Sequence, residues 1–394
     1  MPLFEGLSYT GDKNVVIIDI GAAYTKCGLA GESGPRCIIP SEVKGSVDGK
    51  MKKIWEYSTE EELFDNLKDF LFVLYFRHLL VNPKDRRMVV CESLLCPATF
   101  RHTLARVLFK HYEVGTVMFS SGHLLSLLTL GSSIGLVMDI GYQEALVVPV
   151  YEGIPVLKAM HAIPSASKAI HSRIKKMLLE SAKVTTETRE EKPVSVVPEC
   201  LTEEILEDIK VRCCFVTKFS RAKLIQEITL HGGDSNKLPT PPPGVQYPLD
   251  GGKVLHVSGE VRERACEVMF EQDNEEVSIV TLILDAILQC PIDMRKELAE
   301  NIVIIGGTAM LPGMYHRIKE ELLDLIKKPK YAGNLSLKKF KFHRPPAKEN
   351  YTSWLGGAMF GALETLPSKS VTRDIYLQSG KLTDWCALDR EEVA

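Results

Sequence analysis

The chain has 394 residues, of which 45% are hydrophobic and 25% charged, and its formal net charge is −3. This length can bury a substantial core in two domains or one large bilobal one, and the composition is that of a globular protein. A charge so close to neutral excludes binding to nucleic acid or to an anionic membrane through the overall field of the surface.

The sequence shows neither a secretory signal nor a membrane span. The N-terminal residues lack a basic region followed by an apolar core. The most apolar long segment, Leu63–Leu80, is interrupted by Lys68, Asp69 and Arg77. We therefore expect a soluble, cytoplasmic protein with no membrane insertion and no nucleic-acid partner.

The ten cysteines do not have the spacing of a metal site. Cys91 and Cys96 are close in sequence and Cys213 and Cys214 are adjacent, but no second pair or nearby histidine completes four ligands. Reduced thiols that pack as small hydrophobic side chains are the better interpretation, and they indicate a reducing compartment.

The first half of the chain predicts alternating strands and helices. It begins with a hairpin at Val16–Gly31 (VIIDIGAAYTKCGLAG), followed by a short turn-rich bridge at Pro40–Tyr57. Ser58 and Glu61 can form a capping box for the next helix. One face of that helix carries Leu63, Leu67, Phe70, Leu71, Leu74 and Tyr75. A buried strand at Met88–Leu95 and an amphipathic helix at Thr99–Tyr112 come next.

A second hairpin, Leu136–Val150 (LVMDIGYQEALVVPV), repeats the motif of the first. Two copies about a third of the chain apart indicate two related lobes rather than a solenoid, and the alternation predicts an α/β fold with covered sheets. We expect a mobile polar excursion at Ala182–Glu199 and an irregular connection at Leu238–Gly252. A third glycine turn, at Asn301–Gly313, should follow a strand and precede a helix that begins after Pro312.

The two hairpins place the same chemistry at their turns. Asp19 and Asp139 each end an apolar strand, and Gly21 and Gly141 follow at the turn. Backbone N–H groups there can bind phosphate oxygens, the two carboxylates can hold Mg²⁺ through its waters, and Lys26 can neutralise the phosphates. The alternative is that the two aspartates only cap ordinary turns.

Nearly the whole chain resembles the actin family. The resemblance is carried, in order, by Asp19–Ser41, by the hairpin ending at Pro149–Gly153, by GGTAMLPG at Gly306–Gly313 and by SWLGGAMFGAL at Ser353–Leu363. It implies the actin-like bilobal α/β fold of the actin, hexokinase and heat-shock-70 superfamily, with two lobes around a nucleotide cleft. The implied first lobe is 1–132 plus 346–394, including a shortened outer subdomain at 41–57. The implied second lobe is 133–345, with one subdomain at 133–172 and 275–345 and the other at 173–274.

The resemblance also implies a nucleotide site for ATP or ADP with Mg²⁺, in a structural role. Its first phosphate turn would comprise Asp19, Gly21 and Lys26, its second Asp139 and Gly141, and its adenosine loop Gly306, Gly307, Thr308 and Met310. Lys210 matches the lysine beside the nucleoside. Asp19 and Asp139 would hold the metal through water.

Several positions depart from the family pattern in ways that remove hydrolysis. Ala22 replaces a serine that meets the terminal phosphate, and Tyr142-Gln143 replaces Asp-Gly. Gly122 and Leu146 replace the glutamine and histidine that position the attacking water, and neither side chain can hydrogen-bond one. Val211 and Asn350 replace two groups near the nucleoside. His123 is a replacement candidate, although a lone histidine in an apolar helix is more often a packed residue.

The family's outer subdomain is roughly halved here, with no room for the loop that inserts into a neighbouring subunit. The opposite face resembles the intact assembly face of the family. Its segments are Ser126–Gly135, Gly141–Tyr151 and Ser353–Gly380. Since open head-to-tail assembly requires both faces, the resemblance implies a filament cap. Within the family, Tyr75–Arg87, Phe270–Glu276 and Asp384-Trp385 resemble the subunit at the pointed end of dynactin.

That resemblance implies the partners as well. They would be the actin-related filament subunits and the pointed-end complex proteins of dynactin, with dynein and cargo as indirect partners in a cytoskeletal location. Two other interpretations stay open: a nuclear actin-related protein of a chromatin-remodelling complex, and a small-molecule kinase of the superfamily. For a kinase, Glu144 is the only nearby candidate base.

Overall fold

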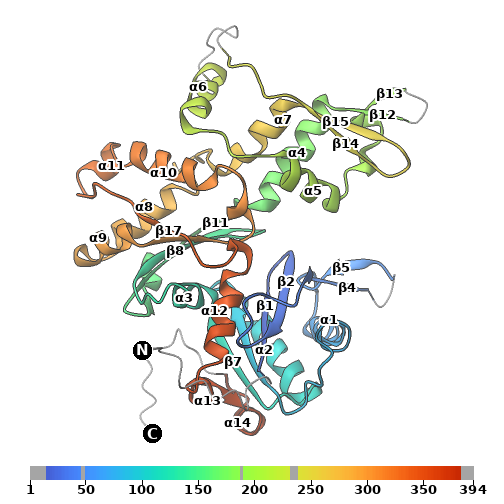
Figure 1. The fold of residues 1–394 in the computed structure, drawn as a ribbon, viewed down its shortest axis with the longest axis vertical. Coiled ribbons are helices and arrows are strands. Elements are labelled where there is room, and N and C mark those ends of the chain that lie inside the picture. Colours follow the sequence, from blue (N-terminus) through green and yellow to red (C-terminus); the bar gives the residue numbers. More distant parts are fainter. Residues whose placement is uncertain (1–14, 46–48, 187–189, 231–237, 383–394) are drawn as a thin grey trace, which may run out of the picture. The chain divides into compact units, whose positions relative to one another are not determined.

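The computed structural model describes residues 15–45, 49–186, 190–230 and 238–382 (Figure 1). The chain divides into two compact units, Met1–Ser133 with Pro345–Ala394, and Ile134–Arg344. Each unit contains its own hydrophobic core and its own mixed sheet. The α/β class expected from the sequence is therefore correct. Among the described residues, no helix is long and apolar enough to cross a membrane.

The first unit is built on a six-stranded sheet with the order β18-β7-β6-β1-β2-β3. The strands of this unit are β1 Val15–Ile20, β2 Tyr24–Leu29, β3 Cys37–Pro40, β4 Glu42–Lys44, β5 Met51–Lys53, β6 Arg87–Glu92, β7 Thr116–Ser121 and β18 Val371–Thr372. Its helices are α1 Glu60–Val73, α2 Ala98–Arg106, α3 Gly122–Leu128, α12 Thr352–Gly361, α13 Leu366–Lys369 and α14 Arg373–Ser379, with π-helical turns at Leu74–Leu79 and Val107–His111 and a 3-10 turn at Glu349–Tyr351.

The side chains of β1 point alternately to the two faces of this sheet and contribute to a hydrophobic core on each face. Val16 and Ile18 join a core with α1 and α2, whereas Val15 and Ile17 join a second core around Trp354 of α12. Trp354 is fully buried, and its indole Nε1 donates to the carbonyl oxygen of Ile17 at 3.1 Å. Helix α12, from the last part of the chain (orange-red in Figure 1), thereby packs against a strand from its first part.

The second unit has a sheet of the order β10-β9-β8-β16-β17, with β11 paired to β9, and a separate four-stranded sheet of the order β13-β12-β15-β14. Its strands are β8 Gly135–Ile140, β9 Ala145–Tyr151, β10 Ile154–Pro155, β11 His161–Ile163, β12 Lys183–Thr185, β13 Glu191–Pro193, β14 Val245–Pro248, β15 Val254–Val257, β16 Ile302–Ile305 and β17 Phe342–His343.

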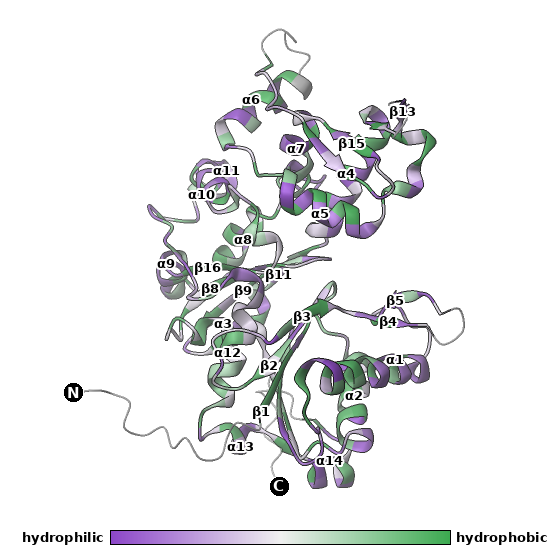
Figure 2. Cartoon of the chain, turned by 45° about the vertical axis from the view of Figure 1, so that its right-hand side comes forward, coloured by the Kyte–Doolittle hydropathy of each residue, from purple (hydrophilic) through white to green (hydrophobic). Residues whose placement is uncertain are grey.

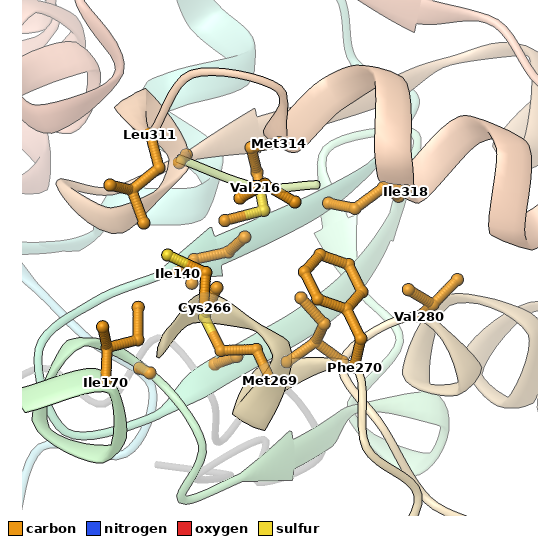
Figure 3. Packing of buried hydrophobic residues seen from close by; sticks show 14 of the residues in the cluster. Ile140, Ile170, Val216, Cys266, Met269, Phe270, Val280, Leu311, Met314 and Ile318 are labelled. Atoms are coloured by element: carbon orange, nitrogen blue, oxygen red, sulfur yellow. The ribbon is translucent and has the colours of Figure 1, made fainter. Parts of the chain in front are cut away.

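Helices cover these two sheets. They are α4 Ser167–Ser181, α5 Glu203–Cys213, α6 Phe219–Leu230, α7 Gly259–Arg264, α8 Thr281–Gln289, α9 Ile292–Glu300, α10 Met314–Leu325 and α11 Pro329–Ala332, with 3-10 turns at Leu157–Ala159, Val194–Val196, Pro198–Cys200, Ala265–Met269 and Thr308–Met310. Figure 3 shows how Ile140 of β8, Met269, Phe270 and Ile318 of α10 converge in one apolar cluster.

The motif repeated in the sequence is also repeated in three dimensions. β1 lies between the antiparallel strand β2 and the parallel strand β6, and β8 lies likewise between β9 and β16. The Asp of each motif occupies the last-but-one residue of its central strand. The predicted third strand and turn are present as β16 and the following glycines, and α10 begins at Met314, just after Pro312.

Two segments expected to be irregular contain strands. The excursion at 182–199 forms the β12–β13 hairpin, with Val184 and Val194 buried, although residues 187–189 lie outside the described part. The proline-rich connection at 238–252 contains β14, which pairs with β15 from Val245 to Pro248. The excursion is therefore not irregular throughout, whereas residues 238–244 and 249–252 lie outside helices and strands as predicted. β12 also pairs with β15, and a partner so distant in sequence cannot be inferred from the local pattern.

The bridge after β3 folds into a two-stranded sheet, β4–β5, and α1 follows it. The N-cap of α1 is Thr59 rather than Ser58: Thr59 Oγ1 accepts from Glu62 N at 3.2 Å, and Glu62 accepts from Ser58 N at 2.7 Å. The predicted apolar face of α1 is buried, while its exposed residues are charged except for Phe72 (Figure 2). The strand predicted at 88–95 ends at Glu92, and the helix predicted at 99–112 spans α2 and the π turn after it.

Candidate functional site

The first turn joins a carboxylate and an ammonium across the β1–β2 hairpin. Asp19 and Lys26 are register partners, and Lys26 Nζ lies 3.1 Å from Asp19 Oδ2. Gly21 N donates to the carbonyl oxygen of Tyr24 at 3.1 Å and closes the turn. The structure thus brings together the three residues predicted for this turn, and the Lys26 ammonium group lies beside the Asp19 carboxylate.

The bridge between β3 and α1 supports the same turn. The carbonyl oxygen of Gly21 accepts from Ser41 Oγ at 2.7 Å and from the indole Nε1 of Trp55 at 3.1 Å. The N–H groups of Ala22 and Ala23 donate to no protein group in the described residues. Two backbone donors therefore remain available at a turn whose conformation is fixed from outside.

The second turn is hydrogen-bonded to the glycine loop, which comprises residues 306–310. Gly141 N donates to Glu144 O at 3.0 Å, and the hydroxyl of Thr308 donates to Gly141 O at 2.6 Å. Asp139 is the register partner of Ile305, which directly precedes Gly306. Four residues predicted from two distant segments, Asp139, Gly141, Gly306 and Thr308, therefore lie together in this unit.

Gly306 occupies a position that only glycine fits. Its φ is +95°, and a Cβ there would lie 2.3 Å from the carbonyl oxygen of Ile140 and 2.5 Å from Asp139 Oδ1. Gly307, by contrast, has no atom within 4 Å of its added Cβ. The side chain of Met310 is 43% exposed. The loop therefore combines a close backbone approach at Gly306 with open space at the next residue.

Lys210 is buried on α5 and is already engaged. Its Nζ lies 2.6 Å from Glu207 Oε2 and donates to the hydroxyl of Ser167, the first residue of α4. Ser167 N in turn donates to Gly141 O at 3.5 Å. Lys210 is thus connected to the second turn through Ser167, and its ammonium group is paired with Glu207.

A polar network missed by the sequence analysis surrounds this lysine. His171 of α4 lies between two carboxylates of α5, with its Nδ1 2.5 Å from Glu203 and its Nε2 3.0 Å from Glu207. Tyr142 donates its hydroxyl to Glu203, and its ring meets that of His171 edge to face. Burial alone would raise the pKa of Glu207, but hydrogen bonds from His171 and Lys210 outweigh it and lower the pKa to about 2.

This network gives the departure at Tyr142 a structural role. The Tyr142 side chain binds the second turn to α4 and α5. The only available sequence signal was the acidic first turn of α5 together with a histidine in α4, and that pattern is too common to predict contact.

The two positions expected to lack a water-positioning group are packed. Leu146 is 2% exposed and lies opposite Asp139 in the hairpin. Gly122 begins α3, and an added Cβ there would lie 3.0 Å from Ser353 Oγ. A glutamine at Gly122 would have to displace that serine.

The two alternative catalytic groups, His123 and Glu144, are in different environments. His123 is 1% exposed, and burial lowers its pKa to about 4, so it is neutral at physiological pH. Its Nδ1 lies 3.4 Å from Ser121 Oγ, consistent with a packed residue. Burial raises the pKa of the Glu144 carboxyl group, and the backbone carbonyl oxygen of the same residue closes the second turn.

Each turn by itself fits part of a phosphate-bearing ligand with a hydrated cation. The first offers a carboxylate, a lysine and unpaired N–H groups, and the second offers a carboxylate beside a glycine loop. No group of three or more His, Cys, Asp or Glu side chains in the described residues could hold a metal by direct ligation. The donor set therefore suits a cation held through its waters and by the ligand's own oxygens.

The hairpin with a terminal Asp, its recurrence in both units and the glycine loop are features of one protein class. A family model described as Actin matches residues 10–386, and the chain therefore belongs to the actin family. Among curated proteins it is similar to "Actin-related protein 10" of Dictyostelium discoideum. The two are 27% identical over 426 aligned residues, which cover 93% of this chain and 86% of the relative.

Proposed function

We propose that this protein is a non-hydrolysing actin-related subunit that caps the pointed end of dynactin's short actin-related filament. In that position it would help recruit the pointed-end complex for dynein-driven transport along microtubules in the cytoplasm. The observation that carries the proposal is the compact bridge between β3 and α1, where the family resemblance implies a larger subdomain with a protruding loop. The similarity to an actin-related protein 10 supports the same assignment.

The bridge is packed onto its own unit rather than extended. Val43 and Ile54 are buried in the core that α1 covers, and Trp55 stacks on Phe100 of α2 with ring centroids 3.8 Å apart. Lys53 pairs with Glu42 at 2.6 Å within the β4–β5 sheet.

These five bridge residues satisfy one another's apolar and charged groups within the unit, although Met51 of β5 is 61% exposed. A subunit with one competent face and one blunted face can join a filament end without extending it.

We further propose that the two turns bind ATP or ADP with Mg²⁺ as a structural ligand. Asp19 and Asp139 would hold the cation through water, and Lys26 would neutralise phosphate charge. The remaining contacts would come from Gly21, Gly141, Lys210, Gly306, Gly307, Thr308 and Met310. The bound cation would offset phosphate charge, while the chain's own backbone amides orient the phosphates.

The functional proposal is tested by affinity isolation of the full chain from cytosol. We expect dynactin subunits to co-purify, and we expect the purified chain not to form pelletable filaments under conditions that assemble actin. Co-purification with chromatin remodellers would instead support the alternative of a nuclear actin-related protein. Filaments of the chain alone would contradict a capping role, whichever partners are recovered.

The nucleotide proposal predicts binding without turnover. Because Gly122 and Leu146 cannot position water, we expect no ATP hydrolysis above the buffer rate, yet about one ATP or ADP per chain after denaturation and chromatography. Lys26→Met should lower the recovered nucleotide severalfold by removing the charge beside Asp19.

Lys53→Met is the matched control, since Lys53 pairs with Glu42 away from the turn, and it should retain the nucleotide. An empty site in well-folded wild-type protein would favour the alternative in which the aspartates only cap turns. Steady-state hydrolysis would instead support the kinase interpretation.

A further inference from the structure

Two cysteines of the first unit form a direct cross-strand pair. Cys27 of β2 and Cys37 of β3 are register partners in an antiparallel ladder, and both thiols are free. The Cα atoms of directly opposed residues in such a ladder lie about 4.5–5.5 Å apart. Disulfides form at Cα separations of about 4.4–6.8 Å. The backbone therefore already meets the main geometric requirement for a bond between them.

The two side chains lie on the same face of the sheet. Cys27 belongs to the buried core that Cys37 packs against, and Cys37 Sγ lies 3.9 Å from the carbonyl oxygen of Cys27. Lys26, the preceding residue, points to the opposite face because side chains alternate along a strand. Among the described cysteines, no other two are strand partners.

The two thiols differ in reactivity. Cys27 is 1% exposed, and burial raises its pKa well above the usual range. Cys37 is only partly buried, and a hydrogen bond from the Cys27 thiol lowers its pKa. Cys37 is therefore the accessible sulfur and the better nucleophile, with a second thiol directly opposite it.

We propose that Cys27 and Cys37 form a reversible redox site that reacts with low-molecular-weight disulfides such as oxidised glutathione. The Cys37 thiolate attacks one sulfur of the oxidant, its S–S bond breaks, and one glutathione thiolate leaves. The Cys27 sulfur, after losing its proton, attacks Cys37 in the mixed disulfide and releases the second glutathione thiolate. Two protein thiols are oxidised, one glutathione disulfide is reduced, and the two leaving thiolates take up the two protons.

The bond would act on the first turn. β3 is followed by Ser41, whose hydroxyl holds the carbonyl oxygen of Gly21. Covalent attachment of β3 to β2 therefore restrains the segment that fixes this turn. The oxidised form should exchange the amide hydrogens of Cys37, Ile38, Ile39 and Ser41 more slowly than the reduced form, because local opening of β3 is blocked.

The test uses the full chain in buffers of graded reduced and oxidised glutathione. After alkylation of free thiols and digestion without reductant, mass spectrometry should detect a peptide pair that links Cys27 to Cys37, reversible by excess reduced glutathione. Mapping by peptide separates this bond from any reaction of Cys386, which lies outside the described residues.

Two variants identify the order of the steps, and a third is the control. Cys27→Ala should accumulate a stable Cys37–glutathione adduct, because the resolving thiol is gone, whereas Cys37→Ser should leave Cys27 unmodified. Cys96→Ser, at a partly buried cysteine with no cysteine partner, is the control and should form the bond like wild type.

Two results in folded wild-type protein would overturn the proposal. One is a Cys37–glutathione adduct that persists without the cross-link, and the other is no reaction of either thiol in the most oxidising buffer.

Discussion

Gly306→Ala is expected to lower the free energy of unfolding by about 2–5 kcal/mol. The φ of +95° is strained for any residue with a Cβ, and the added carbon would approach the carbonyl oxygen of Ile140 to 2.3 Å. The strand end that carries Asp139 would have to move. Chemical denaturation measures the loss, and nucleotide recovered after extraction should fall with it, since the same glycine holds the second turn against the loop.

Gly307→Ala provides the matched control one residue away. Its φ is −65° and its added Cβ meets no atom within 4 Å, so we expect a change within about 0.5 kcal/mol. If both variants lost the same free energy of unfolding, the close approach at Gly306 would not be the cause of the loss.

Arg317→Met is expected to cost about 3–5 kcal/mol, because it leaves the buried carboxylate of Glu321 and the partly buried one of Glu267 without their cation. The guanidinium of Arg317 bonds Glu267 at 2.9 Å and Glu321 at 2.8 Å, and donates to the carbonyl oxygen of Thr217 at 3.0 Å. Its side chain is 6% exposed. Methionine fills similar volume, so the loss measures the uncompensated charges rather than a cavity.

The pH dependence of this loss has a definite sign. Burial already raises the pKa of Glu267 and of Glu321, and Arg317 opposes that rise. Without the arginine, the folded-state pKa values rise further above the unfolded ones, so the folded protein binds more protons as the pH falls. The difference from wild type should therefore shrink from about pH 8 toward about pH 5.

Arg173→Met is the control for that experiment. Arg173 pairs with Glu271 through two bonds of 2.6 and 2.9 Å, but both side chains are substantially exposed. Its removal should cost less than about 1 kcal/mol, with little pH dependence. A comparable loss in both variants would contradict the role assigned to burial.

The parts of the fold that the sequence predicted are those specified locally. The hairpins around Asp19 and Asp139 combine an apolar strand, a turn and a second strand within about fifteen residues, so the pattern alone identifies them. β12 and β14 could not be identified in this way. Each is short: β12 pairs with β13 and with β15, which is distant from β12 in sequence, and β14 pairs with β15.

The residues of the candidate site likewise divide into those that the local sequence predicts and those that depend on tertiary packing. The turn residues were predictable because carboxylates and glycines at strand ends converge on one edge of a sheet. The network of Tyr142, His171, Glu203 and Glu207 was not, because it joins a hairpin and two helices whose contacts depend on tertiary packing. Lys210 was identified by resemblance, but its partner Glu207 and hence its neutralised charge required the structure.

The hydrogen bond from Trp55 to Gly21 makes an optical probe of the first turn. The indole that stacks on Phe100 donates directly to the backbone carbonyl between Asp19 and Lys26. Trp354 is sealed in a different core and bonded to Ile17. Rearrangement of the turn would therefore perturb the emission of Trp55 and spare that of Trp354, without any label being introduced; the third tryptophan, Trp385, lies outside the described residues.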